Sequence, residues 1–220
     1  QRYFIMKSLL TLLVFFISFF CNAQSTDAKE KMQVLLNQLL STPKYECDIT
    51  IKINVKFINM KERSGKMIYH SPDKIDYKIK GFAFLPKNEL AASSTSLLSN
   101  DFVAIGLENQ EINNQVCSVV KVIPIDIEST IVAGQFWINK DSEVCKMTFI
   151  TKDKGSYTAN LFYDNNPYKL PSKAIVTFDV KDQKLPALLT GDLEGYSTDE
   201  EFNEVSKGKI EINYFNYSID

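Results

Sequence analysis

The sequence predicts a mostly β protein of the α+β class: one large, curved antiparallel sheet of about nine to eleven strands, accompanied by one to three helices. Three observations lead to this prediction. Residues 45–57 alternate strictly between apolar and polar side chains, and the second half of the chain contains shorter strand-like segments separated by turn residues. Strand and helix patterns do not alternate along the chain, which disfavours a parallel α/β fold.

The first 23 residues are predicted to be a secretory signal peptide with a short upstream extension. A basic residue, Lys7, is followed by the apolar run 9–20, and a small residue, Ala23, precedes the cleavage site. As a helix the run would be roughly 18 Å long, which is short of the ~30 Å hydrocarbon core of a membrane. Met6 is the natural initiator, which leaves residues 1–5 as the extension.

Two forms of the exported protein are compatible with this pattern. Cleavage after Ala23 gives a secreted protein that begins at Gln24. In the alternative, Cys21 is the lipid-modified cysteine of a lipoprotein, but the residue before such a cysteine is normally small and here is the bulky Phe20. Cleavage after Ala23 is therefore favoured.

Residues 24–220 are predicted to form a single domain, long enough to bury a core. Once Arg2 and Lys7 are subtracted from the 25 basic residues, 23 remain against 27 acidic residues, a net charge of −4. This balance gives no basic surface for nucleic acid or anionic lipid. We expect a monomer that does not bind nucleic acid.

The domain keeps three cysteines, Cys47, Cys117 and Cys145, and an odd number at wide spacing does not indicate a disulfide framework. Cys117 and Cys145 are expected on strands that flank a common neighbour, about 9.6 Å apart, which is too far for a disulfide. Three free thiols are therefore favoured over a Cys117–Cys145 bridge.

An amphipathic helix is predicted before Pro43, which prevents its continuation. Asp27 and Glu30 form a capping-box pattern at its start. The apolar positions follow helical spacing: Met32, Leu35, Leu36, Leu39 and Leu40. We expect this stripe to pack on one face of the sheet, either as an ordinary packing helix or as a cover over a cavity.

Residues 45–57 are predicted to form one long strand with an apolar and a polar face, because successive side chains on a strand point to opposite faces. At ~3.3 Å per residue the strand would span roughly 43 Å, against a usual length of about 17–20 Å, which suits a large curved sheet. The odd positions carry the apolar face: Tyr45, Cys47, Ile49, Ile51, Ile53, Val55 and Phe57.

A hairpin is predicted next, with strands at 65–70 and 74–81 and a turn at Ser71-Pro72-Asp73. A short apolar strand at 82–85 follows it. Residues 87–101 are rich in small residues and could form a loop with a short helix that carries Leu90, Leu97 and Leu98. A lid over a cavity and a plain mobile loop are both compatible with this stretch.

The second half repeats the strand and turn pattern. The final segment is expected to pair at a sheet edge, and residues 185–204, which contain proline, glycine and an acidic cluster, are predicted to be a surface excursion. Strands are predicted at 102–108, 112–123, 131–139, 143–152, 156–164, 172–180 and 207–218.

No group of residues indicates a catalytic site. His70 is the only histidine and lies at a hairpin end, and no cluster of His, Cys and carboxylates has metal-ligand spacing. Neither a phosphate-binding loop nor a nucleophilic serine motif is present. The acidic residues 199–201 lack the alternating spacing of a calcium loop. We therefore expect no enzyme activity, metal or cofactor.

The chain does have more apolar sheet surface than one or two helices can cover. This surface either forms a filled core or surrounds an apolar cavity, the usual form of a ligand site, and composition alone leaves both open. The candidate cavity wall consists of Ile49, Ile51, Ile53, Val55, Met67, Tyr69, Ile75, Tyr77, Ile79, Phe82 and Phe84.

Three stretches resemble the outer-membrane lipoprotein carrier family, which includes LolA and LolB. They are the hairpin within residues 65–78, the strand-turn-strand pattern of 134–141 and 144–149, and the hairpin that turns at Asp153-Lys154-Gly155. With the signal peptide, the helix and the long strand before them, the order of elements is similar to that of the family over most of residues 25–180.

The resemblance implies a half-barrel-like sheet wrapped over helices, with an apolar cavity that binds acyl chains. The function it implies is that of a periplasmic, non-enzymatic carrier or binding protein for a lipid or lipoprotein acyl chain, with envelope membrane proteins as further partners. One position departs from the family, whose carriers place an arginine linked to lid closure before the hairpin proline, where this chain has Ser71. The alternative is an envelope sensor or protein-interaction module on the same fold without lipid transport.

Overall fold

The computed structural model describes residues 26–55, 58–59, 61–72, 74–79, 89–152, 155–164, 168–180 and 206–219. Several expected features lie outside the described residues: the signal peptide, the strand at 82–85 with Phe82 and Phe84, and the acidic excursion at 185–204. The side chains of Val55 and Leu90 are likewise outside this description.

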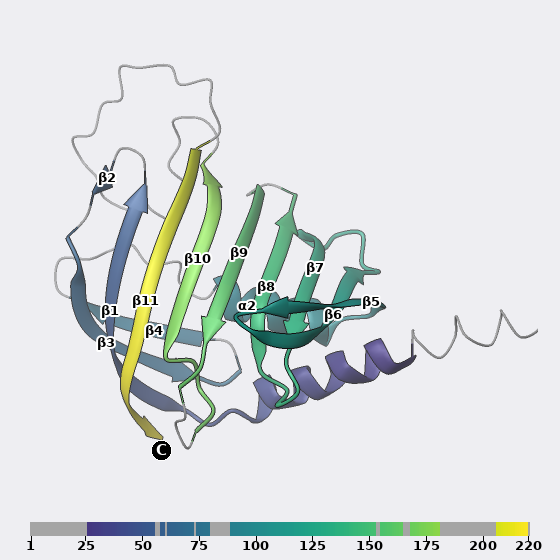
Figure 1. Ribbon diagram of the computed structural model, residues 1–220, viewed down its shortest axis with the longest axis horizontal. Helices are drawn as coiled ribbons and strands as arrows, with labels where there is room; N and C mark the ends of the chain where they lie inside the picture. The colour runs from purple at the N-terminus through teal and green to yellow at the C-terminus, as the bar shows by residue number, and fades with distance from the viewer. Residues whose placement is uncertain are drawn as a thin grey trace, which may run out of the picture.

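The described residues form one open antiparallel sheet and two helices (Figure 1). The spatial order of the strands is β4-β3-β1-β11-β10-β9-β8-β7-β6-β5, and the short β2 pairs with β1. In chain order the strands are β1 (Tyr45–Val55), β2 (Ile58–Asn59), β3 (Arg63–His70), β4 (Lys74–Ile79), β5 (Phe102–Ile112), β6 (Gln115–Pro124), β7 (Ile131–Ile138), β8 (Val144–Thr151), β9 (Gly155–Phe162), β10 (Lys173–Val180) and β11 (Ser206–Ile219).

The predicted fold class is confirmed, and the turn residues account for most of the strand boundaries. Between β5 and β6, Asn113 and Asn114 both have positive φ, at 51° and 61°. Asparagine tolerates this left-handed conformation, which a two-residue hairpin turn requires at both central positions. In Figure 1 the sheet is strongly twisted, so that β4 at one end and β5 with β6 at the other cross the direction of the central strands.

One prediction about the sheet was wrong. The last strand, β11, does not lie at an edge but pairs with both β1 and β10. Its register with β1 places Ile51 opposite Ile212 and Ile53 opposite Ile210. Alternation shows only that one face of a strand is buried, and an edge strand and a central strand of such a sheet can share that pattern.

The first hydrophobic cluster lies on the inner face of the sheet around β1, and is called the β1 cluster here. The alternation in residues 45–53 is confirmed as a buried face, and Ile49, Ile51 and Ile53 are at most 2 % exposed. The buried members of the β1 cluster are Tyr45, Cys47, Ile49, Ile51, Ile53, Met67, Tyr69, Ala159, Val176, Phe178, Ile210 and Ile212.

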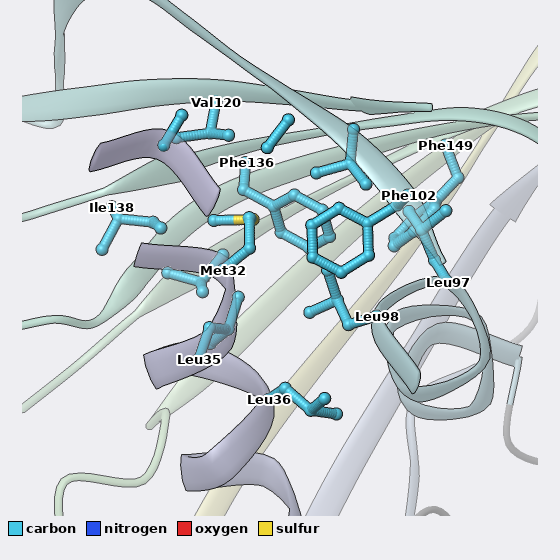
Figure 2. Packing of buried hydrophobic residues seen from close by; sticks show 14 of the residues in the cluster. Met32, Leu35, Leu36, Leu97, Leu98, Phe102, Val120, Phe136, Ile138 and Phe149 are labelled. Atoms are coloured by element: carbon cyan, nitrogen blue, oxygen red, sulfur yellow. The ribbon is translucent and has the colours of Figure 1, made fainter. Parts of the chain in front are cut away.

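The two helices cover the opposite half of the same face. The N-terminal helix, residues 26–41, presents Met32, Leu35 and Leu36 to the sheet, and α2 (Glu89–Ser99) presents Leu97 and Leu98 (Figure 2). Their strand partners in this helix cluster include Phe102, Val120, Phe136, Ile138 and Phe149. The predicted packing of the stripe is thus observed for Met32, Leu35, Leu36 and Leu39, on strands β5 to β8, whereas Leu40 is 47 % exposed and does not belong to this cluster.

The three described cysteines, Cys47, Cys117 and Cys145, are buried free thiols, as favoured from the sequence. Cys117 on β6 and Cys145 on β8 do flank a common neighbour, β7, and pack with Val119 and Trp137 in a small third cluster. Among the described residues, neither helix has the length and apolar character to cross a membrane.

Candidate functional site

A cavity of about 530 Å³ lies between the sheet and the C-terminal end of the N-terminal helix. Its volume falls within the ~300–1,000 Å³ range of small-molecule sites. Leu35 and Leu39 of the helix form one side, and Met147, Val176 and Ile212 are among the apolar residues that the strands contribute.

The position of the cavity follows from the length of the helix. The helix ends at residue 41, and the chain must then reach the start of β1 at Tyr45 through Pro43, which cannot continue a helix. The helices cover β5 to β8, whereas the inner face of β1, β4, β10 and β11 extends beyond them. The space left beside the end of the helix is the cavity.

The mouth of the cavity is formed by three segments that hold most of the solvent-exposed lining residues. They are the end of the N-terminal helix at 41–43, the β7–β8 turn at 141–143 and the β9–β10 connection at 168–171. The charged lining residues all belong to these segments: Asp141, Glu143 and Lys169. Two carboxylates and one ammonium give the part of the mouth that the structure describes a net charge of −1.

Tyrosines are concentrated along the cavity wall. Tyr45 of β1 stacks on Tyr69 of β3, with ring centroids 5.0 Å apart. The Tyr69 hydroxyl donates to the backbone carbonyl of Pro72 at 2.6 Å, and the Tyr163 hydroxyl donates to that of Val144 at 3.2 Å. These two hydroxyls therefore hold the wall together rather than face a ligand.

Three of the four remaining tyrosines of the lining are arranged differently. Tyr45, Tyr77 and Tyr214 also line the cavity, and no hydrogen bond joins their hydroxyls to any part of the chain that the structure describes. Among the described residues, the Thr95 hydroxyl is the one fully buried side-chain polar atom without a hydrogen-bond partner. The hydroxyls of the three tyrosines do not belong to this group, so they are not fully buried. Each of the three oxygens is therefore accessible, on a side chain that lines the cavity.

These three phenols are neutral groups. Burial raises the pKa of Tyr45, Tyr77 and Tyr214 above the usual value near 10, and burial is the largest cause in each case. The tyrosines also raise one another's pKa: Tyr77 and Tyr45 are among the groups that raise the pKa of Tyr214. At physiological pH each is an uncharged O–H group that can donate one hydrogen bond.

Cys47 and His70 lie outside the cavity lining. Burial raises the pKa of the Cys47 thiol to about 12, so it is not a thiolate nucleophile. His70 pairs with Asp76 at 3.0 Å at the end of the β3–β4 hairpin, outside the cavity lining. Within the described ranges, no three His, Cys, Asp or Glu side chains are grouped as metal ligands.

The structure divides the candidate wall residues into two groups. Tyr69, Ile75 and Tyr77 line the cavity. Ile49, Ile51, Ile53 and Met67 are buried in the β1 cluster next to it, and Ile79 packs against that cluster. Contact of any of these residues with a ligand stays a prediction, as it does for Val55, Phe82 and Phe84.

The lid candidates lie in or beside α2. Leu97 and Leu98 are at most 2 % exposed and pack in the helix cluster, so this part of the segment is a core helix in the structure. Ser94 of α2 does reach the cavity, where its hydroxyl donates to the Met147 sulfur at 3.7 Å. A lid role for Leu90, Leu97 and Leu98 stays a prediction.

Several lining residues were not among the sequence-based candidates. Leu35 and Leu39 belong to the predicted helical stripe and could have been included as the cover of the cavity. Tyr214 lies in the last strand, where the alternation of apolar and polar residues could have identified it as an inward-facing side chain. The mouth residues 141–143 and 168–171 carry no pattern that distinguishes them from ordinary turns.

Comparison with known proteins identifies solved structures that have a similar fold. No protein-family model matches the chain, and no curated protein sequence matches it. Among solved structures, it is similar to a LolA superfamily protein from Nitrosomonas europaea, with a TM-score of 0.54 and 12 % identity over 90 % of this chain and 94 % of that one.

Two further solved structures are similar to this chain in fold at low sequence identity. An outer membrane lipoprotein-sorting protein domain, so described, from Vibrio parahaemolyticus has a TM-score of 0.57 and 11 % identity, over 89 % of this chain and 93 % of that one. A DUF1329 family protein from Desulfovibrio piger has a TM-score of 0.55 and 10 % identity, over 90 % and 93 %. The chain therefore has the fold shared by LolA superfamily and DUF1329 family structures.

Proposed function

We propose that this protein is a periplasmic, non-enzymatic carrier or binding protein for a lipid or lipoprotein acyl chain. The observation that carries the proposal is the cavity beside the end of the N-terminal helix, whose wall is mainly aliphatic and aromatic and whose charged residues are confined to the mouth. Such a site binds an apolar chain by removing it from water, at roughly 25 cal/mol per Å² of buried apolar surface.

Two independent points support this proposal. The fold is shared with a domain described as an outer membrane lipoprotein-sorting protein. The N-terminal residues have the pattern of a secretory signal peptide, which would deliver the domain across the inner membrane to the periplasm. Envelope membrane proteins are the corresponding candidate partners for delivery or release of the ligand.

The proposal can be tested with the domain that begins at Gln24. The protein is unfolded, extracted with organic solvent to remove lipid, refolded, and titrated with 1-monolaurin while binding is followed by native mass spectrometry. We expect a 1:1 complex. Absence of any complex with monolaurin, laurate or dodecylglycerol would contradict the proposal.

A matched pair of substitutions places the ligand. Leu161 lines the cavity from β9, whereas Leu107 is exposed on β5 and does not line it. Leu161→Trp fills part of the cavity and should abolish the complex, while Leu107→Trp should leave it unchanged. Far-UV circular dichroism of both variants shows that they are folded before binding is compared.

A second candidate function is a protein-interaction module, and one observation favours it. The edge strand β5 exposes Val103, Ile105 and Leu107, each more than 40 % accessible, on the face of the sheet opposite the helices. An exposed apolar edge can pair with a strand of another protein. Failure of every acyl ligand to bind would favour this function.

A further inference from the structure

The hydroxyls of three cavity tyrosines can each donate a hydrogen bond to a bound ligand. Tyr45, Tyr77 and Tyr214 come from β1, β4 and β11, which lie within one half of the sheet, and all three residues line the cavity with hydroxyls that are accessible. A purely apolar chain would leave three buried donors without acceptors, at a cost that buried polar groups normally avoid by hydrogen bonding. The cavity is therefore built for a ligand with a polar acceptor.

The charges around the cavity restrict the kind of acceptor. Among the described residues, Lys169 is the one Lys, Arg or His that lines the cavity, and it is exposed at the mouth near Asp141 and Glu143. A carboxylate or phosphate beside the tyrosines would lose its hydration without gaining a cation. At the mouth the same anion would meet a net negative charge.

An uncharged carbonyl satisfies both conditions. Its oxygen accepts hydrogen bonds at two lone pairs, and in an ester the neighbouring single-bonded oxygen is a further acceptor, so three O–H donors are received without carrying a charge into the cavity. In an acyl ester this carbonyl is attached directly to the apolar chain, so the two parts of the ligand match the two parts of the wall. A free fatty acid, which is ionised at neutral pH, does not.

We propose that the hydroxyls of Tyr45, Tyr77 and Tyr214 form a subsite for the uncharged carbonyl of an acyl ester, so that the cavity selects esterified acyl chains over free fatty-acid anions. This inference rests on the proposed function, because it names the class of ligand for the same cavity. It goes beyond that function in assigning a donor set and a direction of selectivity.

Three ligands with the same chain length separate the contribution of the ester carbonyl from those of the apolar chain and of a charged head group. Monolaurin has the ester carbonyl, 1-O-dodecylglycerol has the same head group without the carbonyl, and laurate has a charged carboxylate. Each is titrated at pH 8, below its micellar concentration, into the delipidated domain. We expect monolaurin to bind about tenfold or more tightly than either of the others.

The subsite is tested by Tyr→Phe substitutions, which keep the ring and remove only the hydroxyl. In the triple variant Tyr45→Phe/Tyr77→Phe/Tyr214→Phe, monolaurin and dodecylglycerol should bind equally, with dodecylglycerol affinity unchanged within about twofold. The control is Tyr217→Phe, because the Tyr217 hydroxyl donates to the Pro171 carbonyl at 2.5 Å and Tyr217 does not line the cavity. This variant should keep the full preference for the ester.

The possible outcomes separate a failure of the tyrosine subsite from a failure of the proposed function. If all three ligands bind but laurate or dodecylglycerol binds as tightly as monolaurin, the subsite is refuted and the proposed function stands. The subsite is also refuted if the triple variant keeps the preference. If no ligand binds to the folded protein, the proposed function itself is refuted.

Discussion

Leu97 of α2 lies directly over Gly134 of β7. A β-carbon at position 134 would be 2.5 Å from the Leu97 Cδ2 atom and 3.3 Å from the rings of Phe136 and Phe149. Leu97 is rigidly held, since it is 1 % exposed within the helix cluster. Glycine is thus what allows α2 to approach the sheet, where the Ser94 hydroxyl lies 3.7 Å from the Met147 sulfur.

Gly134→Ala should therefore destabilise the protein by overpacking, by about 1–3 kcal/mol. Urea unfolding gives the free-energy change. The contact is identified by a double-mutant cycle, because Leu97→Ala removes the atom that clashes: the double variant should be less destabilised than the sum of the two single variants. Simple additivity would show that the two residues do not interact.

The cavity and the core make different predictions for neighbouring isoleucines. Ile51 is 2 % exposed in the β1 cluster, so Ile51→Ala should cost about 2–5 kcal/mol of folding free energy. Ile75 lines the cavity and is only half-buried, so Ile75→Ala should cost about 1 kcal/mol. Equal costs in urea unfolding would contradict the assignment of one residue to filled core and the other to the cavity wall.

The open tyrosine hydroxyls make a prediction for stability that is independent of any ligand. Tyr77→Phe should change the free energy of unfolding of the ligand-free protein by less than about 0.5 kcal/mol, because its hydroxyl has no partner among the described residues to lose. Tyr163→Phe removes the bond to the Val144 carbonyl and should cost about 0.5–1.5 kcal/mol. A larger loss for Tyr77→Phe than for Tyr163→Phe would contradict the description of the cavity wall.

The buried phenols also predict how stability depends on pH. Burial raises the pKa of Tyr45, Tyr77, Tyr163 and Tyr217 in the folded protein, whereas in the unfolded chain tyrosine has a pKa of about 10. Above pH ~10 the unfolded chain releases these protons and the folded protein keeps them, so the contribution is fully present below that pH and is lost as the pH rises.

We therefore expect the free energy of unfolding in urea to fall between pH 9 and pH 11. The double variant Tyr45→Phe/Tyr77→Phe should show a shallower fall, because two of the groups no longer titrate. A wild-type stability that is the same at both pH values would contradict the burial of these phenols.

The strands of this fold could be predicted from the sequence because their signals are local. Alternation in residues 45–53 and the Asn113-Asn114 turn each specify a backbone conformation without reference to distant residues. The position of β11 could not be predicted, since its partners β1 and β10 are chosen by pairing over long sequence separations.

The site was predictable only in outline. The middle of β1 was the natural candidate for a cavity wall, yet Ile49 and Ile51 are fully packed. The cavity lies near the start of β1 because the N-terminal helix ends there, which is a consequence of three-dimensional packing. Which tyrosine hydroxyls have partners depends on single distances, such as that from Tyr69 to the Pro72 carbonyl, which no sequence pattern encodes.

The most direct measurement of the central claim is methyl NMR of the domain labelled with [methyl-¹³C]methionine. Met147 lines the cavity, while Met32 is fully buried in the helix cluster. On titration with monolaurin, the Met147 methyl resonance should shift and saturate at one equivalent, and that of Met32 should stay in place. Saturation with ligand without any shift of Met147 would show that the cavity is not the acyl-binding site.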